Sequence, residues 1–302
     1  MMPIWSRRTF LSASLASFAL SACKQDVSLP VAVPLINDPA LRKLEQESGG
    51  RLGVACINAA GDTLFANRAD ERFAMCSTFK APLAAALFEA HDRGIADRFA
   101  RIRVREDDFV PYAPFTENLV KEGQDTTLDE MAYQAVIISD NAAANIVLRA
   151  IGGPEAFTDF LRRQGDDVTR LDRYEPELNE NAIDDPRDTT SPLAMAGLLR
   201  RLLLKNEGSA AHADRLIKWM LDTKTGIARI RAGLPDAWRL GHKTGTAPQS
   251  APCYNDVGII FPPDQPPVLL AVYFDRPDVA WKEAEAVIAE TTRLAAQKIV
   301  VK

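Results

Sequence analysis

The stretch WRLGHKTGT, Trp238–Thr246, is a short apolar run that ends in polar and glycine residues, and it decides the expected fold. Two further apolar runs follow it, Asp256–Phe261 and Val268–Asp275, with turn residues between them. Arg51–Asn58 and Thr63–Asn67 repeat the pattern near the other end of the chain. Short apolar runs bounded by turn residues predict strands, so the sequence predicts strands near both of its ends.

Helical patterns occupy most of the remaining sequence. Asp38-Pro39 is a start signal and Gly49-Gly50 a stop signal for a first helix, and the apolar spacing of Val279–Val300 predicts a last one. We therefore expect an α/β (α+β) fold, in which N- and C-terminal segments form one antiparallel sheet flanked by the terminal helices. The middle of the chain becomes an inserted all-helical subdomain, and the cleft between the two units is the expected binding site.

Length and composition agree with one domain in two parts. The 302 residues are near the size at which one core gives way to two subdomains. With 47% hydrophobic and 25% charged residues the chain is typical of a globular protein, and a net charge of −5 without a basic run excludes nucleic acid as a partner. The expected segments are an export signal over 1–22, a linker over 23–37, an α/β subdomain over 38–68 and 224–302, and a helical subdomain over 69–223.

The N-terminal segment has the pattern of an export signal. Arg7 and Arg8 precede an apolar stretch, Phe10–Ala22, that is shorter than the roughly 20 residues of a membrane span. Ser6–Leu11 resembles the twin-arginine export motif, with an ordinary secretory head as the alternative. The residues that end at Cys23 resemble a lipobox, so Cys23 is either lipidated or a coincidental cysteine at a cleavage site. Either signal predicts a periplasmic or otherwise exported protein, with a membrane contact only through a lipid on Cys23.

Ser77-Thr78-Phe79-Lys80 is the first motif that carries chemistry. On a helix, residues three apart share a face, so the Lys80 ammonium is expected beside the Ser77 hydroxyl. A serine is a weak nucleophile until a neighbour takes its proton, and a desolvated lysine can be that base. The same spacing occurs in Ser21–Lys24 inside the export segment, so the motif taken alone also fits an exposed helix pair.

Two further motifs could present polar side chains to the same cleft. Ser139–Asn141 (SDN) lies between an apolar run and a helix-forming stretch, although all three residues are also good helix N-caps. Lys243–Thr246 (KTGT) ends its strand, where the lysine can hold a carboxylate and the glycine lets a ligand lie close to the backbone. Lys224–Gly226 (KTG) is similar, but it leads to no strand and is set aside.

A polar, irregular segment runs from Arg173 to Asp188 and contains Glu175 and Asn179. The opposite charges at its two ends predict a compact loop pinned by an ion pair between Arg173 and Asp188. An ordinary surface loop is the alternative, in which the carboxylates only interact with solvent.

The four segments occur in one order, each in a fitting local context, and together they resemble the class A β-lactamases of the penicillin-binding and serine β-lactamase superfamily. The resemblance extends from about Asp38 to the C-terminus. It implies an enzyme that opens the β-lactam ring through an acyl-serine, hydrolyses that ester and so confers resistance to β-lactam antibiotics. We further expect a monomer without metal or organic cofactor, whose partners are β-lactams and water.

The same resemblance assigns roles to individual residues. Ser77 is the nucleophile, Lys80 its partner, and Ser139 the proton relay to the leaving nitrogen. Glu175, steered by Asn179, holds and activates the deacylating water, and either Glu175 or Lys80 takes the first proton.

A second group of residues is assigned to substrate binding. The backbone N–H groups of Ser77 and Thr246 form an oxyanion hole, in which one donor is typically worth about 2.7–4 kcal/mol. Lys243 and Thr244 form the pocket for the substrate carboxylate. The full set of binding residues is Asn141, Asn179, Lys243, Thr244, Gly245, Thr246, Arg229 and Tyr112.

Glu175 separates two functions. Penicillin-binding DD-peptidases and non-hydrolysing β-lactam sensors share the other motifs but lack a water-activating acid in this loop, so the Glu-x-x-x-Asn spacing favours a hydrolase. Zinc chemistry is excluded because His91, His212 and His242 have no zinc-ligand spacing. On a strand, His242 points away from its neighbour Lys243, so no Ser-His-Asp triad is expected.

Three further positions bear on specificity, and two of them, Arg229 and Thr246, are similar to the carbapenem-hydrolysing subset of the family. Tyr112 resembles an aromatic residue at the cleft mouth, with a solvated loop tyrosine as the alternative. Arg229 resembles an arginine that assists carboxylate binding, with a surface arginine as the alternative, and Thr246 fits the subset too.

The cysteines give one more comparison with that subset. Cys76 precedes the nucleophile, as in the subset, where its partner cysteine directly follows Lys-Thr-Gly-Thr. Ala247 occupies that position here and Cys253 is the next cysteine, so a Cys76–Cys253 disulfide is the hypothesis. Cys56, in an expected strand, is interpreted as a buried thiol.

Overall fold

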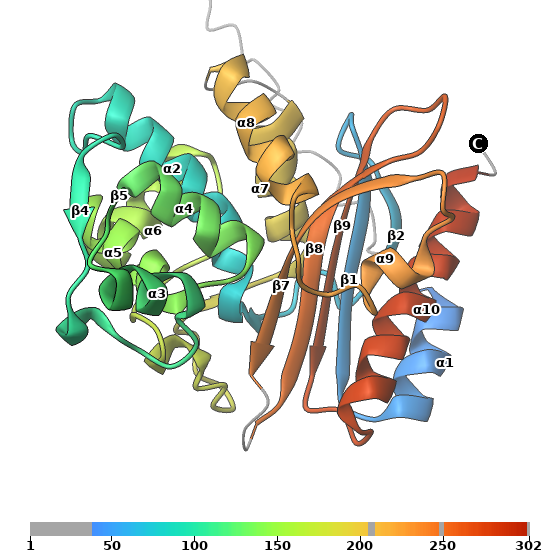
Figure 1. The fold of residues 1–302 in the computed structure, drawn as a ribbon. Coiled ribbons are helices and arrows are strands. Elements are labelled where there is room, and N and C mark those ends of the chain that lie inside the picture. Colours follow the sequence, from blue (N-terminus) through green and yellow to red (C-terminus); the bar gives the residue numbers. More distant parts are fainter. Residues whose placement is uncertain (1–37, 205–208, 248–250, 301–302) are drawn as a thin grey trace, which may run out of the picture. The chain divides into compact units, whose positions relative to one another are not determined.

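The computed structural model describes residues 38–204, 209–247 and 251–300, all within one compact unit, Leu35–Lys302 (Figure 1). The expected export signal over 1–22 and the linker over 23–37, including Cys23, lie outside the described residues. In the described part of the chain, no helix has both the length and the apolar character needed to cross a membrane.

A five-stranded antiparallel sheet joins the two ends of the described chain, as the sequence predicts. Its strands are β1 (Arg51–Asn58), β2 (Thr63–Asn67), β7 (Arg239–Ala247), β8 (Cys253–Phe261) and β9 (Val268–Asp275). Their order is β2-β1-β9-β8-β7, and Arg51 on β1 pairs with Asp275 on β9. An N-terminal strand and a C-terminal strand are therefore neighbours in the middle of the sheet.

Side chains of this sheet alternate between two cores, because successive residues of a strand point to opposite faces. On β9, Val272 and Phe274 belong to one core, whereas Ala271 and Tyr273 belong to the other. Every residue of β9 is buried. This double burial explains why the strand is a continuous apolar run without alternation in its sequence.

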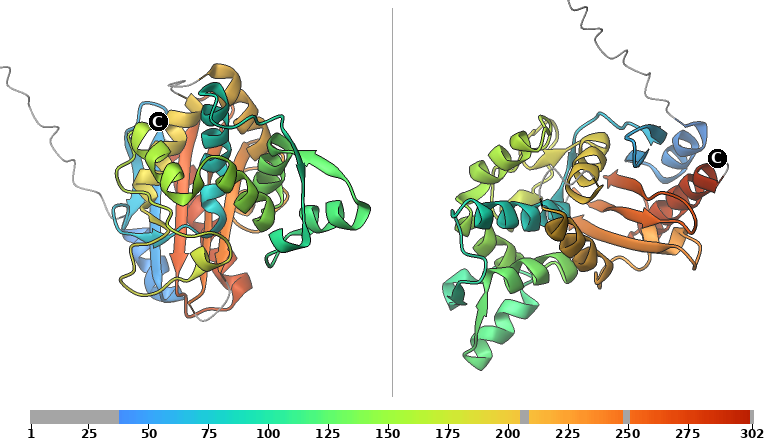
Figure 2. Two further views of the ribbon diagram at one scale, coloured as in Figure 1. Left: turned by 90° about the vertical axis from the view of Figure 1, so that its left-hand side faces the viewer. Right: turned by 90° about the horizontal axis from the view of Figure 1, so that it is seen from above.

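Helices cover both faces of the sheet (Figures 1 and 2). One face carries α1 (Pro39–Ser48) and α10 (Trp281–Val300), and the other carries α7 (Pro192–Leu204) and α8 (Ala210–Leu221). A further short helix, α9 (Ile230–Gly233), packs on α10. The predicted limits of α1 are confirmed, because Asp38 caps its first turn and Gly49, at positive φ, ends it.

The inserted part of the chain is mainly helical, with two short sheets in addition. β3 (Phe73–Ala74) pairs with β6 (Thr189–Thr190), and β4 (Arg101–Arg103) pairs with β5 (Asp125–Thr127). Strands of two or three residues are too short to show an alternating pattern, which is why the sequence analysis does not predict them. The helices of the insert are η1 (Cys76–Phe79), α2 (Lys80–Asp92), η2 (Glu106–Asp108), α3 (Pro114–Glu122), α4 (Leu128–Ile137), α5 (Asn141–Ala150), α6 (Gly153–Arg163) and η3 (Glu177–Asn179). The boundary of a subdomain at 69–223 stays a prediction, since α7 and α8 from that range pack on the sheet.

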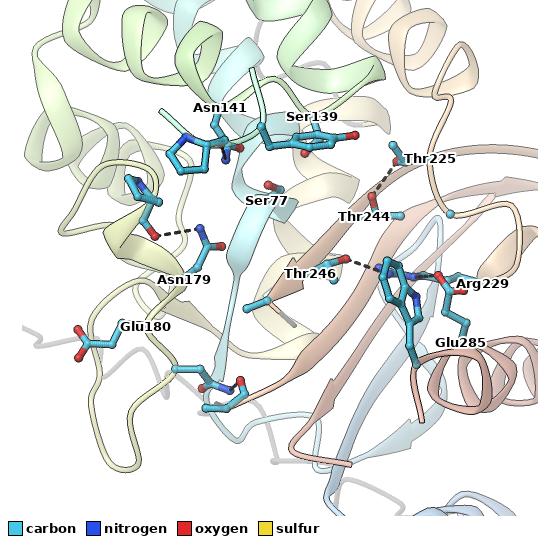
Figure 3. Close-up of a pocket in the computed structure, with 18 of the residues that line it drawn as sticks. Ser77, Ser139, Asn141, Asn179, Glu180, Thr225, Arg229, Thr244, Thr246 and Glu285 are labelled. Carbon is cyan, nitrogen blue, oxygen red and sulfur yellow. Dashed lines mark hydrogen bonds and ion pairs between the residues drawn. The ribbon is translucent and has the colours of Figure 1, made fainter. Parts of the chain in front are cut away.

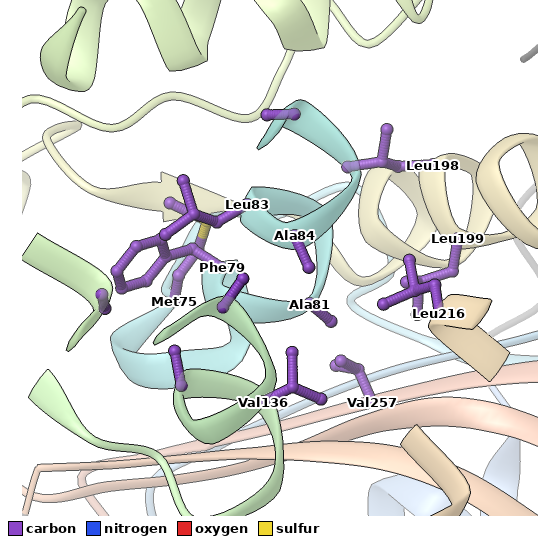
Figure 4. Packing of buried hydrophobic residues seen from close by; sticks show 14 of the residues in the cluster. Met75, Phe79, Ala81, Leu83, Ala84, Val136, Leu198, Leu199, Leu216 and Val257 are labelled. Atoms are coloured by element: carbon purple, nitrogen blue, oxygen red, sulfur yellow. The ribbon is translucent and has the colours of Figure 1, made fainter. Parts of the chain in front are cut away.

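Helix α2 lies at the centre of the insert and is buried nearly all round, as Figure 4 shows. Ala81 and Ala84 are small, so side chains such as Leu199, Leu216 and Val257 from neighbouring elements pack close to the helix. A helix that is apolar on all sides belongs in a core. The junction of η1 and α2, which carries Ser77 and Lys80, is thereby fixed against both the insert and the sheet.

Replacing Ile288 on α10 by alanine is expected to destabilise the protein without changing catalysis by the folded fraction. Ile288 is fully buried in the core between α10 and the sheet, so the truncation leaves a cavity and costs about 2–5 kcal/mol of unfolding free energy. Urea unfolding measures the loss, with the exposed Val300→Ala on the same helix as the matched control. A loss equal to that of the control would contradict the packing described above.

Candidate active site

The main cleft, with a volume of about 800 Å³, lies where β7, the insert and the 173–188 loop meet. In Figure 3, Ser77 lies in the middle of the cleft, Ser139 and Asn141 lie above it, and Asn179 faces β7 across it. The sequence motifs, far apart in the chain, therefore contribute side chains to one cleft.

Glu175 connects the nucleophile candidate to its lysine. Ser77 Oγ donates to Glu175 Oε1 at 3.4 Å, and Lys80 Nζ lies 3.0 Å from the same oxygen. Both charged side chains are fully buried. Among the described residues no direct hydrogen bond joins Ser77 and Lys80, and a shared carboxylate oxygen links the two side chains.

Ser139 lies between two ammonium groups. Lys243 Nζ donates to its Oγ at 3.0 Å and Lys80 Nζ at 3.5 Å, and Lys80 also donates to Asn141 Oδ1. An ammonium has no lone pair, so the serine oxygen accepts from both lysines and its own hydrogen is left for another acceptor. This arrangement suits a hydroxyl that passes a proton on.

Lys243 is a buried cation in a positive environment. Burial, followed by the nearby charge of Lys80, lowers the pKa of Lys243 well below its usual range. Its Nζ also donates to the Thr244 carbonyl at 2.9 Å. An anionic ligand in the cleft would offset the cost of keeping Lys243 charged, as a carboxylate pocket requires.

The Ser139–Asn141 motif both caps a helix and contributes side chains to the cleft, and Asp140 is its capping residue. It is the N-cap of α5, where its carboxylate accepts from the N–H of Ala143 at 2.8 Å and from the N–H groups of Phe115 and Thr116. Ser139, at positive φ, precedes this cap. The cap thus fixes the chain that presents Ser139 and Asn141 to the cleft.

The loop from Arg173 to Asp188 is held as predicted. Arg173 Nε lies 2.6 Å from Asp188 Oδ2, and Asp188 Oδ1 accepts from the backbone N–H of Arg173 at 3.0 Å. Asn179 Nδ2 donates to Glu175 Oε2 at 2.5 Å. The Glu175–Pro176 peptide bond is cis. The loop is therefore pinned at its ends and aims one carboxylate at Ser77.

Asn145 holds the backbone of Glu175, a role that the sequence analysis missed. Its Nδ2 donates to the Glu175 carbonyl at 2.8 Å, and its Oδ1 accepts from the Glu175 N–H at 2.9 Å. Asn145 lies four residues after Asn141 on α5, and this helical spacing was the one available signal that the two side chains share a face.

Gly245 lets strand β7 approach the nucleophile. A Cβ on Gly245 would lie 2.6 Å from the Met75 carbonyl oxygen and 3.1 Å from Thr78 Cγ2, both beside Ser77. The close approach brings Thr246 and Ser77 to the same cleft. Their backbone N–H groups stay the predicted oxyanion hole.

Arg229 is a buried residue, so the alternative of a surface arginine is wrong. It is 3% exposed and donates to Thr246 Oγ1 at 2.8 Å and to the carbonyls of Gly245 and Asn255. Its Nε also lies 3.0 Å from Glu285 Oε1. The guanidinium thus supports the edge of β7 from behind and positions the Thr246 hydroxyl.

Three more residues, Tyr112, Thr225 and Gly226, line the cleft. Tyr112 is 59% exposed and lines the cleft, in agreement with an aromatic residue at its mouth. The set-aside segment Lys224–Gly226 also contributes, because Thr225 and Gly226 line the cleft and Thr225 Oγ1 lies 2.7 Å from Thr244 Oγ1. It forms no strand and is not a second copy of the KTG motif, but it supports the real one.

The cysteines are thiols in this structure. Cys76 Sγ and Cys253 Sγ are both buried and lie 2.9 Å apart. Cys253 pairs with Ala247 across β7 and β8, and Cys76 packs in the same small core cluster. The hydrogen bond with Cys253, together with burial, raises the pKa of Cys76. Cys56 is a buried thiol as expected, and burial raises its pKa to about 12.

No cluster of histidine, cysteine, aspartate and glutamate that could hold a metal ion is present in the described ranges. His242 does not face Ser77, since its Nδ1 lies 2.9 Å from Asp256 Oδ1. The nucleophilic and ionisable side chains that meet at the cleft are Ser77, Ser139, Lys80, Lys243 and Glu175. A serine beside a buried lysine–glutamate pair and a second lysine–serine pair defines a serine hydrolase that works through an acyl-serine.

Comparisons with known proteins agree with this class. The Beta-lactamase enzyme family model matches residues 38–299. Beta-lactamase L2 of Stenotrophomonas maltophilia is 38% identical over 300 residues, covering 96% of this chain and 98% of that protein. Beta-lactamase OXY-1 of Klebsiella oxytoca is 41% identical over 254 residues, covering 84% of this chain and 86% of that protein.

Solved structures give the same result. The class A β-lactamase of the last common ancestor of Gram-negative bacteria superposes with a TM-score of 0.82 at 49% identity, covering 85% of this chain and 97% of that one. A β-lactamase from Xanthomonas campestris gives 0.82 at 38% identity, covering 86% of this chain and 96% of that one. The chain belongs to the β-lactamase enzyme family and is a class A serine β-lactamase that acts in resistance to β-lactams.

The pH dependence of kcat/KM is expected to report the lowered pKa of Lys243. As pH rises through that pKa, Lys243 loses its charge and no longer attracts the substrate carboxylate, so kcat/KM falls on the alkaline side at a lower pH than an ordinary lysine would give. In Lys243→Arg, the guanidinium stays charged and the alkaline fall moves to higher pH. An unchanged alkaline limb in this variant would assign the titration to another group.

Proposed function

We propose that this enzyme opens the β-lactam ring with Ser77 and clears the acyl-serine with a water molecule activated by Glu175. The position of one carboxylate carries the proposal. Glu175 Oε1 contacts both Ser77 and Lys80, while Oε2 accepts from Asn179. The same group is thus within reach of the nucleophile and of the space beside Asn179, where a water can be held.

In the first half-reaction, Ser77 Oγ attacks the lactam carbonyl carbon and its proton passes to Glu175. The hydroxyl already donates towards Oε1, and this contact supports Glu175 over Lys80 as the first acceptor. Lys80 keeps its proton and stabilises the ionised carboxylate beside it. The backbone N–H groups of Ser77 and Thr246 donate to the oxyanion that develops.

The leaving nitrogen then takes its proton from Ser139. Because Ser139 Oγ accepts from Lys80 and Lys243, its hydrogen is available to the lactam nitrogen when the C–N bond breaks. Lys80 then replaces that proton and takes the one on Glu175 Oε1, 3.0 Å away, which returns Glu175 to its carboxylate form. The carboxylate of the substrate binds Lys243, Thr244 and Thr246, and Arg229 acts on it through the Thr246 hydroxyl.

In the second half-reaction, Glu175 takes a proton from water as the water oxygen attacks the acyl carbon, and it returns that proton to Ser77 Oγ when the ester bond breaks. A DD-peptidase or a non-hydrolysing sensor is the alternative function, since both acylate the same serine. The buried Glu175, held by Asn145 and Asn179, favours the hydrolase, because an acid fixed this tightly beside the nucleophile is what deacylation needs.

The proposal includes export of a monomeric enzyme. The twin-arginine pattern and apolar stretch within 1–22 support an export signal, and the lipobox-like residues before Cys23 support a lipid anchor on that cysteine. The enzyme would then work in the periplasm, held to a membrane only by its lipid.

A disulfide between Cys76 and Cys253 is also part of the proposal. The two thiols already face each other in the folded protein, and an oxidising compartment supplies the acceptor for their two electrons. Since both are buried and the pKa of Cys76 is raised, thiolate chemistry is slow once the protein has folded.

Replacing Glu175 by glutamine is expected to trap the acyl-enzyme. Intact-mass spectrometry of residues 24–302 with a penicillin should show a transient adduct on Ser77 in the unmodified enzyme and a lasting one in Glu175→Gln, with deacylation slower by about 10²–10⁴-fold. Glu177→Gln, an exposed glutamate of the same loop, is the matched control. A lasting adduct in the unmodified enzyme would instead indicate a penicillin-binding protein or sensor.

Mass spectrometry of the exported protein without reductant tests the remaining parts of the proposal. We expect the loss of two hydrogens in the peptide pair that holds Cys76 and Cys253, with Cys56 free. We also expect an N-terminus at Cys23 that carries lipid mass. Free Cys76 and Cys253 thiols would remove the disulfide, and an unlipidated N-terminus would remove the anchor.

A further inference from the structure

Trp281 is a large, solvent-exposed aromatic residue at the edge of the active-site cleft. It is the first residue of α10, is 54% exposed, and lines the cleft together with Thr246, Arg229 and Glu285. Indole side chains carry much apolar surface and are usually well covered in folded proteins. An exposed tryptophan in the wall of a substrate cleft offers that surface to a ligand.

Trp281 is fixed relative to the carboxylate edge of the cleft through Tyr254. Tyr254 is buried and lies opposite Thr246 in the β7–β8 pair. Its ring centroid lies 6.4 Å from that of Trp281 with a tilt of 34°, and Arg229 Cζ lies 5.8 Å from the centroid of the Tyr254 ring. Arg229, Tyr254 and Trp281 thus form a continuous layer that starts behind Thr246 and ends at the exposed indole.

Glu285 adds a negative charge beside this layer. It follows Trp281 by four residues on α10, so the two side chains share a helix face. Its Oε1 pairs with Arg229 Nε, and its side chain keeps 18% exposure towards the cleft. Figure 3 shows Glu285 and Arg229 together next to Thr246.

Arg229 offsets part of this negative charge, but its guanidinium is the less exposed partner of the pair. The guanidinium is 3% exposed and is committed to the Thr246 hydroxyl, two backbone carbonyls and Glu285. Of the side chains of this layer, the Trp281 indole and the Glu285 carboxylate are the ones exposed at the cleft. Both attract cations, the first through its π electrons and the second through its charge.

We propose that Trp281 and Glu285 form a subsite for a cationic aromatic substituent on the ring carbon next to the carboxylate-bearing carbon of a cephalosporin-type substrate. The inference rests on the proposed function, in which Lys243, Thr244 and Thr246 bind the carboxylate. A substituent on the neighbouring ring carbon extends away from the carboxylate group, and Trp281 and Glu285 line the same cleft as Thr246. A pyridinium group has the charge and the flat shape that such a subsite accepts.

The test compares three cephalosporins with the same acylamino side chain. Their substituents at the position in question are methyl, phenylmethyl and pyridiniomethyl, and the readout is the ratio of kcat/KM values within each enzyme. In Trp281→Ala we expect the pyridinium-to-methyl ratio to fall by about 2- to 30-fold. In Trp281→Phe the ratio falls by less, because a phenyl ring still binds cations, although more weakly than an indole. In Glu285→Gln the pyridinium-to-phenylmethyl ratio falls.

Phe99→Ala is the matched control, since Phe99 is an equally exposed aromatic residue (54%) that does not line the cleft. Its ratios should equal those of the unmodified enzyme. Equal ratios in Trp281→Ala and the control would overturn the subsite. Equal losses for phenylmethyl and pyridiniomethyl, with no effect of Glu285→Gln, would overturn its preference for cations.

Failure of the Trp281–Glu285 subsite can be distinguished from failure of the proposed hydrolase function. If the unmodified enzyme forms a lasting adduct with all three compounds, the hydrolase is wrong and no kcat/KM ratio exists to compare. In that event the rates of acylation of Ser77 by the three compounds still decide the subsite, because the substituent is present when the serine attacks.

Discussion

The buried ion pair between Lys80 and Glu175 is the interaction on which the rest of the site depends. Two charges with no solvent contact are costly unless each is paired and fully hydrogen-bonded. The surrounding structure meets that demand. Asn141 and Ser139 accept from Lys80, and Asn179 donates to Glu175. The polar residues of the cleft therefore stabilise the folded protein, because they satisfy the two buried charges.

This constraint also explains why the site is made of rigid parts. Glu175 comes from an irregular loop, so its position has to be imposed from outside, by Asn145 on α5 and by the ion pair of Arg173 with Asp188. Lys80 begins a helix with core residues on almost all sides. Ser77 Oγ and Glu175 Oε1 are 3.4 Å apart, and proton transfer over such a contact tolerates little displacement, so both groups need the support of well-packed elements.

Much of the fold was predictable because its strands are simple. β1, β2 and β9 have the limits expected from apolar runs, whereas β8 begins at Cys253, three residues before the predicted start, where nearby prolines indicated a loop. The catalytic motifs were predictable because their chemistry dictates residue types and spacings. Asn145, Thr225, Glu285 and Trp281 were missed, because they act through contacts between segments distant in sequence, and no local pattern marks such contacts.

The pairing of β1 with β9 determines when this protein can fold. Arg51 and Asp275 meet across a sequence separation of 224 residues, so the middle of the sheet cannot form until nearly the whole chain has been synthesised. The entropy cost of closing so large a loop comes before the non-local contacts can stabilise the sheet, and folds of high contact order therefore form slowly. Until then the apolar β1 has no partner on one edge and is prone to aggregation. The joined ends thus lengthen the time during which the growing chain exposes an unpaired apolar strand.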